Sequence, residues 1–286
     1  MGQIIRGLVC ATALLFVAGN ATAQPQGNDE QKCINKINNG VTKVHAAQGK
    51  LNSGCIKDFV NEKVPSADAC YLADAKGNVG KKKAKLVDDD AKNCGTVPAF
   101  AFTSGTFAGT TAAQAELDLI HDIYGNPTNP NLYLCDTNPA ECLCQRQVNG
   151  RISKTFRAMS KIFVQCKKAA LAIGKDPFVT GAASASDIAQ CITNGSIGLS
   201  VEADTKGKVD SAESQLKDTA EQFCFTTPNN EFGGGACAGF DNNPAGLAAC
   251  IRDRVECRFC NMFKAADALG GAINCQTWSG AAGCPN

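Results

Sequence analysis

The pair Cys257-x-x-Cys260 comes nearest to a catalytic motif in residue type and spacing. In thiol oxidoreductases such a pair opens a helix after a strand, where the helix dipole lowers the pKa of one thiol. Here the pair lies inside a segment with helical periodicity, among other cysteines and without a preceding strand. We therefore expect structural disulfides at both positions, with a redox pair or a cysteine-ligated metal as alternatives. Asn261 follows the pair, so the C-x-x-C-H pattern of haem attachment is not met.

The two histidines, His45 and His121, lie on separate segments. His121 has Asp118 and Asp122 beside it, and imidazole with carboxylate can ligate a metal ion. We expect instead that both histidines lie at the surface or have a hydrogen-bond partner. Because the chain has only two histidines, it offers few candidates for the general base of a Ser–His–Asp or Cys–His catalytic site. The sequence therefore predicts a protein that is not an enzyme, with no catalytic residue, no cofactor and no metal ligand.

The first 23 residues have the pattern of an export leader. Arg6 is the only charged residue before Asp29. An apolar stretch follows from 8 to 18, and Ala21-Thr22-Ala23 has the small residues that signal peptidase requires. The apolar stretch is shorter than the roughly 20 residues that span a bilayer. We expect a secreted or periplasmic protein that starts at Gln24 and does not span a membrane.

The cysteine count agrees with export. The chain has 17 cysteines, and 16 remain when Cys10 of the leader is removed. An even number of thiols in an oxidising compartment predicts up to eight disulfides. Free buried cysteines in a cytosolic protein are the alternative, which the leader disfavours.

The charges of the mature chain cancel, because the loss of Arg6 leaves 27 basic and 27 acidic residues. A chain of this kind has no overall basic charge for binding nucleic acid. One local run of lysines, at 81–83 and 85, is followed by the aspartates 88–90. We expect these charges to pair along a helix or to face water, with an anion-binding patch as the alternative.

Two segments of the chain repeat each other without gaps. The run from Asp74 to Cys94 matches the run from Asp204 to Cys224, and both begin with D-x-K-G-x-V. Upstream, the spacing from Cys33 to Cys55 equals that from Cys144 to Cys166. A mainly apolar stripe between these cysteines steps by three or four positions, as on one face of a helix: Ile34, Ile37, Val41, Val44, Gln48 and Leu51 in one copy, and Val148, Ile152, Thr155, Met159 and Ile162 in the other. Such self-similarity is typical of a duplicated helical unit.

The cysteine spacing also predicts how each unit folds back. The pairs Cys33–Cys94 and Cys55–Cys70 are both centred near residue 63, next to Pro65, where a turn is expected. By the internal repeat, the second unit would use Cys144–Cys224 and Cys166–Cys191. The other eight cysteines have no predicted partner: Cys135, Cys142, Cys237, Cys250, Cys257, Cys260, Cys275 and Cys284.

The fold class is thus mainly α, with two disulfide-laced antiparallel helical hairpins and a cysteine-rich helical C-terminal cap. We divide the chain into a leader (1–23), a first unit with a loop and short helix (24–143), a second unit with a loop (144–249) and the cap (250–286). The short helix is expected from Thr111 to Tyr124, and a third long helix from about Leu247 in the shortened cap. Trp278 is expected in an exposed, glycine-rich loop.

The units C-x21-C followed by D-x-K-G-x-V…C carry a family resemblance, as does the ending Cys250-Ile-Arg-Asp-Arg-Val-Glu-Cys257-Arg-Phe-Cys260…Asn274-Cys275…Cys284-Pro285. This pattern resembles uncharacterised secreted cysteine-rich proteins of deltaproteobacteria, including myxobacteria. The resemblance covers most of the mature chain and is specific in cysteine spacing. It implies a bacterial protein exported to the envelope, and it implies nothing about chemistry.

We expect a non-enzymatic structural or interaction protein whose protein or surface partner is contacted by the loops at 95–143 and 225–249. The alternatives are a protein that binds a small ligand or metal, in a groove between the hairpins or near His121, and a thiol oxidoreductase centred on Cys257 and Cys260. The sequence leaves the partner and the oligomeric state open.

Overall fold

The computed structural model describes residues 25–224, 232, 234–240 and 243–285. The expected leader, residues 1–23, lies outside this part of the chain. The described residues form a mainly helical fold, whose elements are α1 (Asn28–Val60), α2 (Ala67–Ala73), α3 (Asn78–Asn93), α4 (Gly105–Tyr124), η1 (Asn129–Asn131), α5 (Pro139–Leu171), α6 (Ala185–Thr193), α7 (Lys208–Cys224), α8 (Pro244–Ala266), η2 (Gly270–Ala272) and α9 (Cys275–Ser279).

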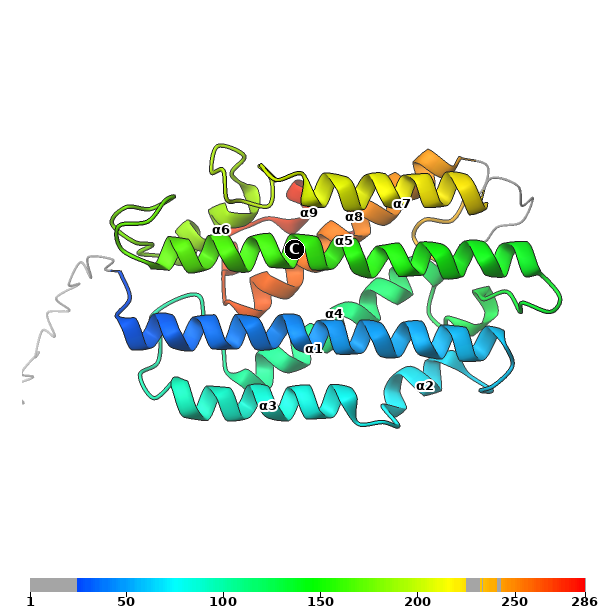
Figure 1. Cartoon of the computed structure of the whole chain (residues 1–286), viewed down its shortest axis with the longest axis horizontal. Coiled ribbons are helices and arrows are strands. Elements are labelled where there is room, and N and C mark those ends of the chain that lie inside the picture. The colour runs from blue at the N-terminus through cyan, green and yellow to red at the C-terminus, as the bar shows by residue number, and fades with distance from the viewer. Residues whose placement is uncertain (1–24, 225–231, 233, 241–242, 286) are drawn as a thin grey trace, which may run out of the picture.

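Two long helices, α1 and α5, are each paired with a shorter, broken helix pair. The chain runs along α1, turns, and returns antiparallel through α2 and α3 (Figure 1). Disulfides Cys33–Cys94 and Cys55–Cys70 join this first hairpin near its two ends. Disulfides Cys144–Cys224 and Cys166–Cys191 join α5 to α7 and α6 in the same way. These are the four pairs expected from the sequence, and the arrangement is compatible with a duplicated unit.

The apolar stripe of α1 forms the interior of the first hairpin. Ile34, Ile37, Val41 and Val44 are almost completely buried, as their spacing of three and four residues requires for one helix face. Leu86 of α3 packs on the same stripe at Gly40, where the missing side chain leaves room for it. Burying residues of this size contributes about 1.5–3 kcal/mol each.

The D-x-K-G-x-V motif is a turn that starts the returning helix. Asp74 has a positive φ of 39°, and its side chain accepts a hydrogen bond of 2.8 Å from the amide of Gly80. Asp204 has a φ of 31° and accepts one of 2.7 Å from the amide of Val209. The glycine of the motif also has a positive φ, of 61° at Gly77, which a residue without Cβ tolerates. The motif is therefore structural.

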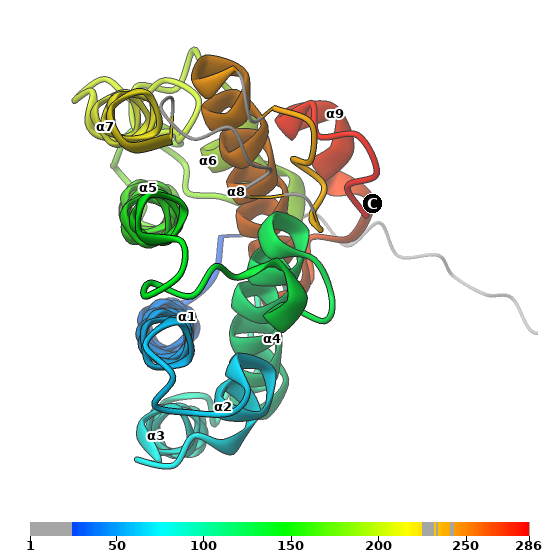
Figure 2. The same ribbon diagram turned by 90° about the vertical axis from the view of Figure 1, so that its right-hand side faces the viewer.

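The helices form two layers (Figure 2). Helices α3, α1, α5 and α7 lie side by side in one layer, and α4 and α8 cross behind it in the second. Helix α9 lies on the far side of α8. The helices α1 and α5 therefore have one side against the second layer and the opposite side free.

Two contacts define the antiparallel register of α1 and α5. The rings of His45 and Phe156 stack with centroids 3.5 Å apart. Nδ2 of Asn149 donates to Oγ of Ser53 over 3.0 Å. His45 lies twelve residues after Cys33, and Phe156 lies twelve residues after Cys144, so equivalent positions of the two units meet at this point.

Two expectations about the connecting segments need correction. Helix α4 begins at Gly105 rather than Thr111, because the Ser104 side chain caps it by accepting from the amide of Phe107; it ends at Tyr124 as expected. Much of 95–143 is therefore not an exposed loop, since Leu119 and Tyr124 are fully buried. Most of the expected partner-facing loop at 225–249 precedes α8, and parts of it lie outside the described residues.

The C-terminal segment was expected as a cap at the end of a stack. Helix α8 instead begins at Pro244, with Asn243 accepting from the amide of Gly246, and it packs against α4, α5 and α7. It is a central element of the second layer. Trp278, expected in an exposed loop, lies in α9, where its ring is 5.9 Å from that of Phe259 and its Nε1 donates to Glu202.

Candidate functional site

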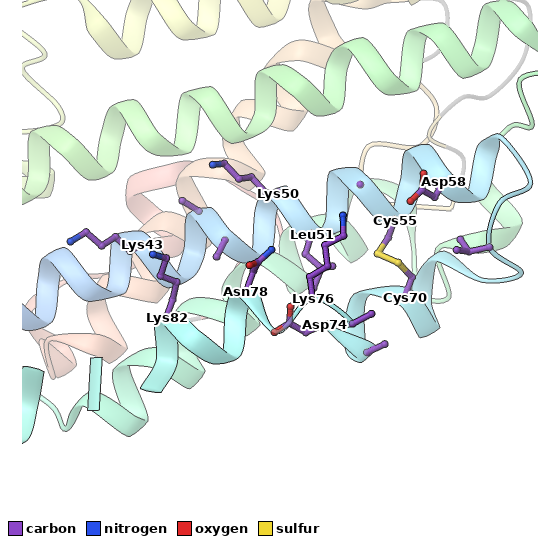
Figure 3. A pocket seen from close by; sticks show the side chains of 16 residues that line it. Lys43, Lys50, Leu51, Cys55, Asp58, Cys70, Asp74, Lys76, Asn78 and Lys82 are labelled. Carbon is purple, nitrogen blue, oxygen red and sulfur yellow. A yellow bond between two sulfur atoms is a disulfide. The ribbon is translucent and has the colours of Figure 1, made fainter. Parts of the chain in front are cut away.

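A groove of ≈ 790 Å³ lies between α1 and the break that separates α2 from α3 (Figure 3). It forms because the chain leaves the helical conformation at 74–77, where Asp74 and Gly77 both have positive φ. The small residues Ala46, Ala47 and Gly54 of α1 leave this space open opposite the break. The groove lies within the first hairpin, whereas the sequence suggested a space between the hairpins.

The floor of the groove is apolar. Leu51, Val64 and the disulfide Cys55–Cys70 line it together with the small residues of α1, and most of these side chains are half-buried. Nothing lies within 4 Å of a Cβ placed on Gly54, so the groove is open at that point. Pockets for small ligands are typically apolar and measure about 300–1,000 Å³.

Charged side chains stand at the rim of the groove and are unevenly placed. Lys43 of α1 and Lys82 of α3 line one end, where Lys82 extends toward α1, and Lys50 lies next along α1 (Figure 3). Lys76 extends across the middle, and Asp58 lies at the other end. An anionic group would therefore be attracted to the end with the three lysines.

The two cysteines of the C-x-x-C motif do not pair with each other. Cys257 is bonded to Cys284 and Cys260 to Cys275, so the motif ties α8 to the C-terminal segment. All four residues are buried. The remaining cysteines without a predicted partner form Cys135–Cys142 and Cys237–Cys250. The described chain thus holds eight disulfides and uses all of its 16 cysteines.

His45 is buried beside a carboxylate. Its Nε2 lies 2.8 Å from Oε2 of Glu116, and the two side chains are 4% and 1% exposed. Gly49 is required next to this pair, because a Cβ there would lie 2.8 Å from Oε1 of Glu116. The His45 ring stacks on Phe156 and is buried, so it is part of the packed interior and has no room beside it for a substrate.

His121 and its neighbouring carboxylates do not converge. Its Nε2 lies 4.0 Å from Oδ1 of Asp68, whereas Asp118 and Asp122 both bind Arg258 of α8, at 3.2 and 2.6 Å. These carboxylates therefore join α4 to α8. Among the described residues, no group of three or more His, Cys, Asp or Glu could hold a metal ion.

A pair of carboxylic acids lies between α7 and α8. Burial, and after it the charge of the nearby Glu213, raises the pKa of Glu256 to about 8. Burial also raises the pKa of Glu213 to about 7, against the opposing attraction of Arg252. No contact of the pair points to a ligand, and both groups are ordinary carboxylic acids held partly out of water.

No helix of the described chain is long and apolar enough to cross a membrane.

The groove could not be predicted directly from the sequence, because much of its floor consists of alanine, glycine and cystine, residues that also occur in ordinary helix packing. The available clue was the D-x-K-G turn: it breaks the second arm of the hairpin opposite Ala46, Ala47 and Gly54, which are too small to fill the gap.

Comparisons of the chain with protein-family models, with curated proteins and with solved structures found no match.

Proposed function

We propose that the chain is an exported, non-enzymatic binding protein that holds an amphipathic anion in the groove between α1 and the α2–α3 break. The ligand class is a molecule with an apolar body and a carboxylate, phosphate or sulfate head. The observation that carries the proposal is the combination of an apolar floor with Lys43, Lys50 and Lys82 gathered at one end of the groove.

The geometry gives the ligand a direction. Its head would lie between Lys43 and Lys82, where ammonium groups donate to an anion, and its apolar body would lie along Leu51 toward the disulfide Cys55–Cys70. Each methylene group removed from water would contribute up to about 0.8 kcal/mol. The carboxylate of Asp58, at the other end of the groove, would repel the head of a ligand bound in the reverse direction.

The affinity for dodecanoate, measured by its displacement of a fluorescent anilinonaphthalene sulfonate from the protein, tests the proposal. Gly54→Leu should weaken dodecanoate binding at least about tenfold, because the new side chain fills the groove without meeting any atom near its Cβ. Gly150→Leu, in the middle of α5, is the matched control, since its Cβ is also free of contacts. Equal binding by the two variants would show that the groove is not the site.

A comparison of dodecanoate with the uncharged dodecanol tests the role of the lysines. Lys43→Gln with Lys82→Gln should weaken dodecanoate and leave dodecanol unaffected, because only the carboxylate uses the charge. Loss of both ligands, or of neither, would argue against recognition of an anionic head.

Export is supported by the eight disulfides, since structural disulfides form in oxidising compartments. The mass of the exported protein should correspond to a chain that begins at Gln24 with its 16 remaining cysteines oxidised. A mass that includes residues 1–23 or free thiols would contradict this part of the proposal. A thiol oxidoreductase is not favoured, because Cys257 and Cys260 have different partners.

A further inference from the structure

The free sides of α1 and α5 carry basic residues and no acidic ones. From 31 to 57 in α1 and from 142 to 171 in α5, the sequence contains neither aspartate nor glutamate. The exposed charged residues of these spans are all basic: Lys32, Lys36, Lys43, Lys50 and Lys57 in α1, and Arg146, Lys154, Lys161 and Lys168 in α5. Although the mature chain has zero net charge, basic residues are therefore concentrated on the free sides of α1 and α5, apart from the acidic residues.

The register of the two helices places most of these residues opposite each other. His45 meets Phe156, Ser53 meets Asn149, and Asn38 lies 3.2 Å from Lys167, which sets an antiparallel alignment along the whole seam. The alignment gives four rungs, which we call the basic ladder: Lys36 with Lys168, Lys43 with Lys161, Lys50 with Lys154, and Lys57 with Arg146.

The rungs recur every seven residues along α1, which corresponds to about 10.5 Å along a helix axis. The whole ladder, from Lys36 to Lys57, is therefore about 30 Å long. Its two rows belong to neighbouring packed helices, whose axes lie about 8–10 Å apart. Lys36, Lys43 and Lys168 line one groove of ≈ 460 Å³ with Lys85 of α3, so the two rows open on the same face of the molecule.

The charges of the ladder are not paired within the described chain. None of its eight residues takes part in an ion pair there, whereas Lys85 beside it pairs with Asp89 at 3.3 Å. Like charges that face each other repel, and an array of this kind raises the local concentration of anions. We propose that the basic ladder is the docking surface for a linear acidic polysaccharide that lies along the seam between α1 and α5.

The shape of the charged region favours a linear partner over a flat one. Of the outer helices of the same layer, α7 carries the exposed carboxylates Asp210, Asp218 and Glu221, and α3 carries Asp88 among its exposed lysines. A planar anionic membrane would meet all four helices, including these carboxylates, whereas a single polymer chain would meet only the two middle ones.

The side chains between the rungs favour a sugar polymer over a nucleic acid. Exposed Asn39, Gln147 and Gln165 offer amide groups to hydroxyls, and the exposed positions of α1 and α5 include no aromatic residue. Single-stranded nucleic acids are usually held by stacking of bases on aromatic side chains, with about 1–3 kcal/mol for each base. This inference goes beyond the proposed ligand of the groove and does not depend on it.

Fluorescence anisotropy with labelled oligogalacturonates at about 50 mM salt, where charge contacts are strong, tests the docking surface. The variant Lys57→Gln/Lys154→Gln/Lys161→Gln/Lys168→Gln removes half of the ladder and leaves every lysine of the dodecanoate groove in place. Its affinity should fall at least about tenfold. The control Lys175→Gln/Lys206→Gln/Lys208→Gln/Lys217→Gln has the same net charge, and its affinity should change less than about twofold.

Affinity should also rise with the length of the oligosaccharide until it spans about 30 Å, the length of the ladder. An equal loss of oligogalacturonate affinity in the ladder variant and in the control variant would mean that only net charge matters, and it would overturn the proposal. Tighter binding to phosphatidylglycerol vesicles or to single-stranded DNA than to oligogalacturonate of equal charge would overturn the choice of partner. Because the ladder variant keeps the groove intact, its dodecanoate binding should equal that of the unchanged protein, so failure of one proposal is distinguishable from failure of the other.

Discussion

Lys167 of α5 and Asp267, just after α8, form an ion pair of 2.7 Å in which the side chains are 0% and 1% exposed. The ammonium group also donates to Oδ1 of Asn38 at 3.2 Å and to the carbonyl oxygen of Ala101 at 3.1 Å. One buried cation thus joins α1, the segment before α4 and the end of α8. Burial lowers the pKa of Lys167 and raises that of Asp267, since each charge is removed from water.

Removal of one member of this pair should be strongly destabilising. Lys167→Met leaves the carboxylate of Asp267 buried without its cation, and such a loss costs about 3–5 kcal/mol. The free energy of unfolding, measured in guanidinium chloride with the disulfides intact, checks this value. Lys168→Met is the matched control, because Lys168 is the exposed neighbour and its change should stay within about 0.5 kcal/mol.

The double variant Lys167→Met/Asp267→Leu should recover much of the lost stability, since both charges are removed from the interior. If Lys167→Met were no more harmful than Lys168→Met, the buried ion pair would have no structural importance.

Lys167 shows where sequence reasoning reaches its limit. The cysteine spacing and the apolar stripe were sufficient to predict α1, α5 and the hairpin turn near residue 63. Two adjacent lysines follow Cys166, however, and no local pattern says which of them is buried. The internal alignment contained the answer, because Lys167 occupies the position of Ile56, which is 1% exposed. A polar residue at an apolar position of a repeat indicates a buried partner elsewhere in the chain.

The second layer was harder to predict for a different reason. Helices α4 and α8 follow the two hairpins in equivalent order, yet they share no gap-free sequence match, so the repeat did not reveal them. Alanines form much of the buried face of α4, including Ala108 and Ala112, and they give a weak hydrophobic signal. The basic ladder could have been read from the sequence, as two long spans without acidic residues, but a summed charge conceals it.

Two glycines of α1 should respond in opposite directions to the same substitution. Gly40→Ala should destabilise the protein by about 1–3 kcal/mol, because the new Cβ would overlap Cδ1 of the fully buried Leu86. Gly54→Ala should stabilise it by up to about 1 kcal/mol, since the position is open and alanine favours the helix. Guanidinium unfolding of both variants checks the signs. Destabilisation by Gly54→Ala would mean that the groove closes more tightly than described.

Glu256 should make stability depend on pH in an unusual direction. Because burial raises its pKa from 4.5 to about 8, the folded chain holds this proton more firmly than the unfolded chain does. The resulting stabilisation is complete below the unfolded pKa of 4.5 and is lost as the pH rises through about 8. Glu256→Gln should therefore match the unchanged protein at about pH 4 and exceed its free energy of unfolding by at least about 1 kcal/mol at pH 9.

Glu221→Gln provides the control for this comparison, because Glu221 lies on α7 with its side chain 50% exposed. Its free energy of unfolding should run parallel to that of the unchanged protein from about pH 4 to about pH 9, since an exposed carboxylate has nearly the same pKa folded and unfolded. The Glu256→Gln curve should diverge upward, and the divergence should begin near pH 5, where the unfolded chain starts to release the proton that the folded chain retains. Parallel curves for both variants would mean that Glu256 is more hydrated than its position between α7 and α8 implies.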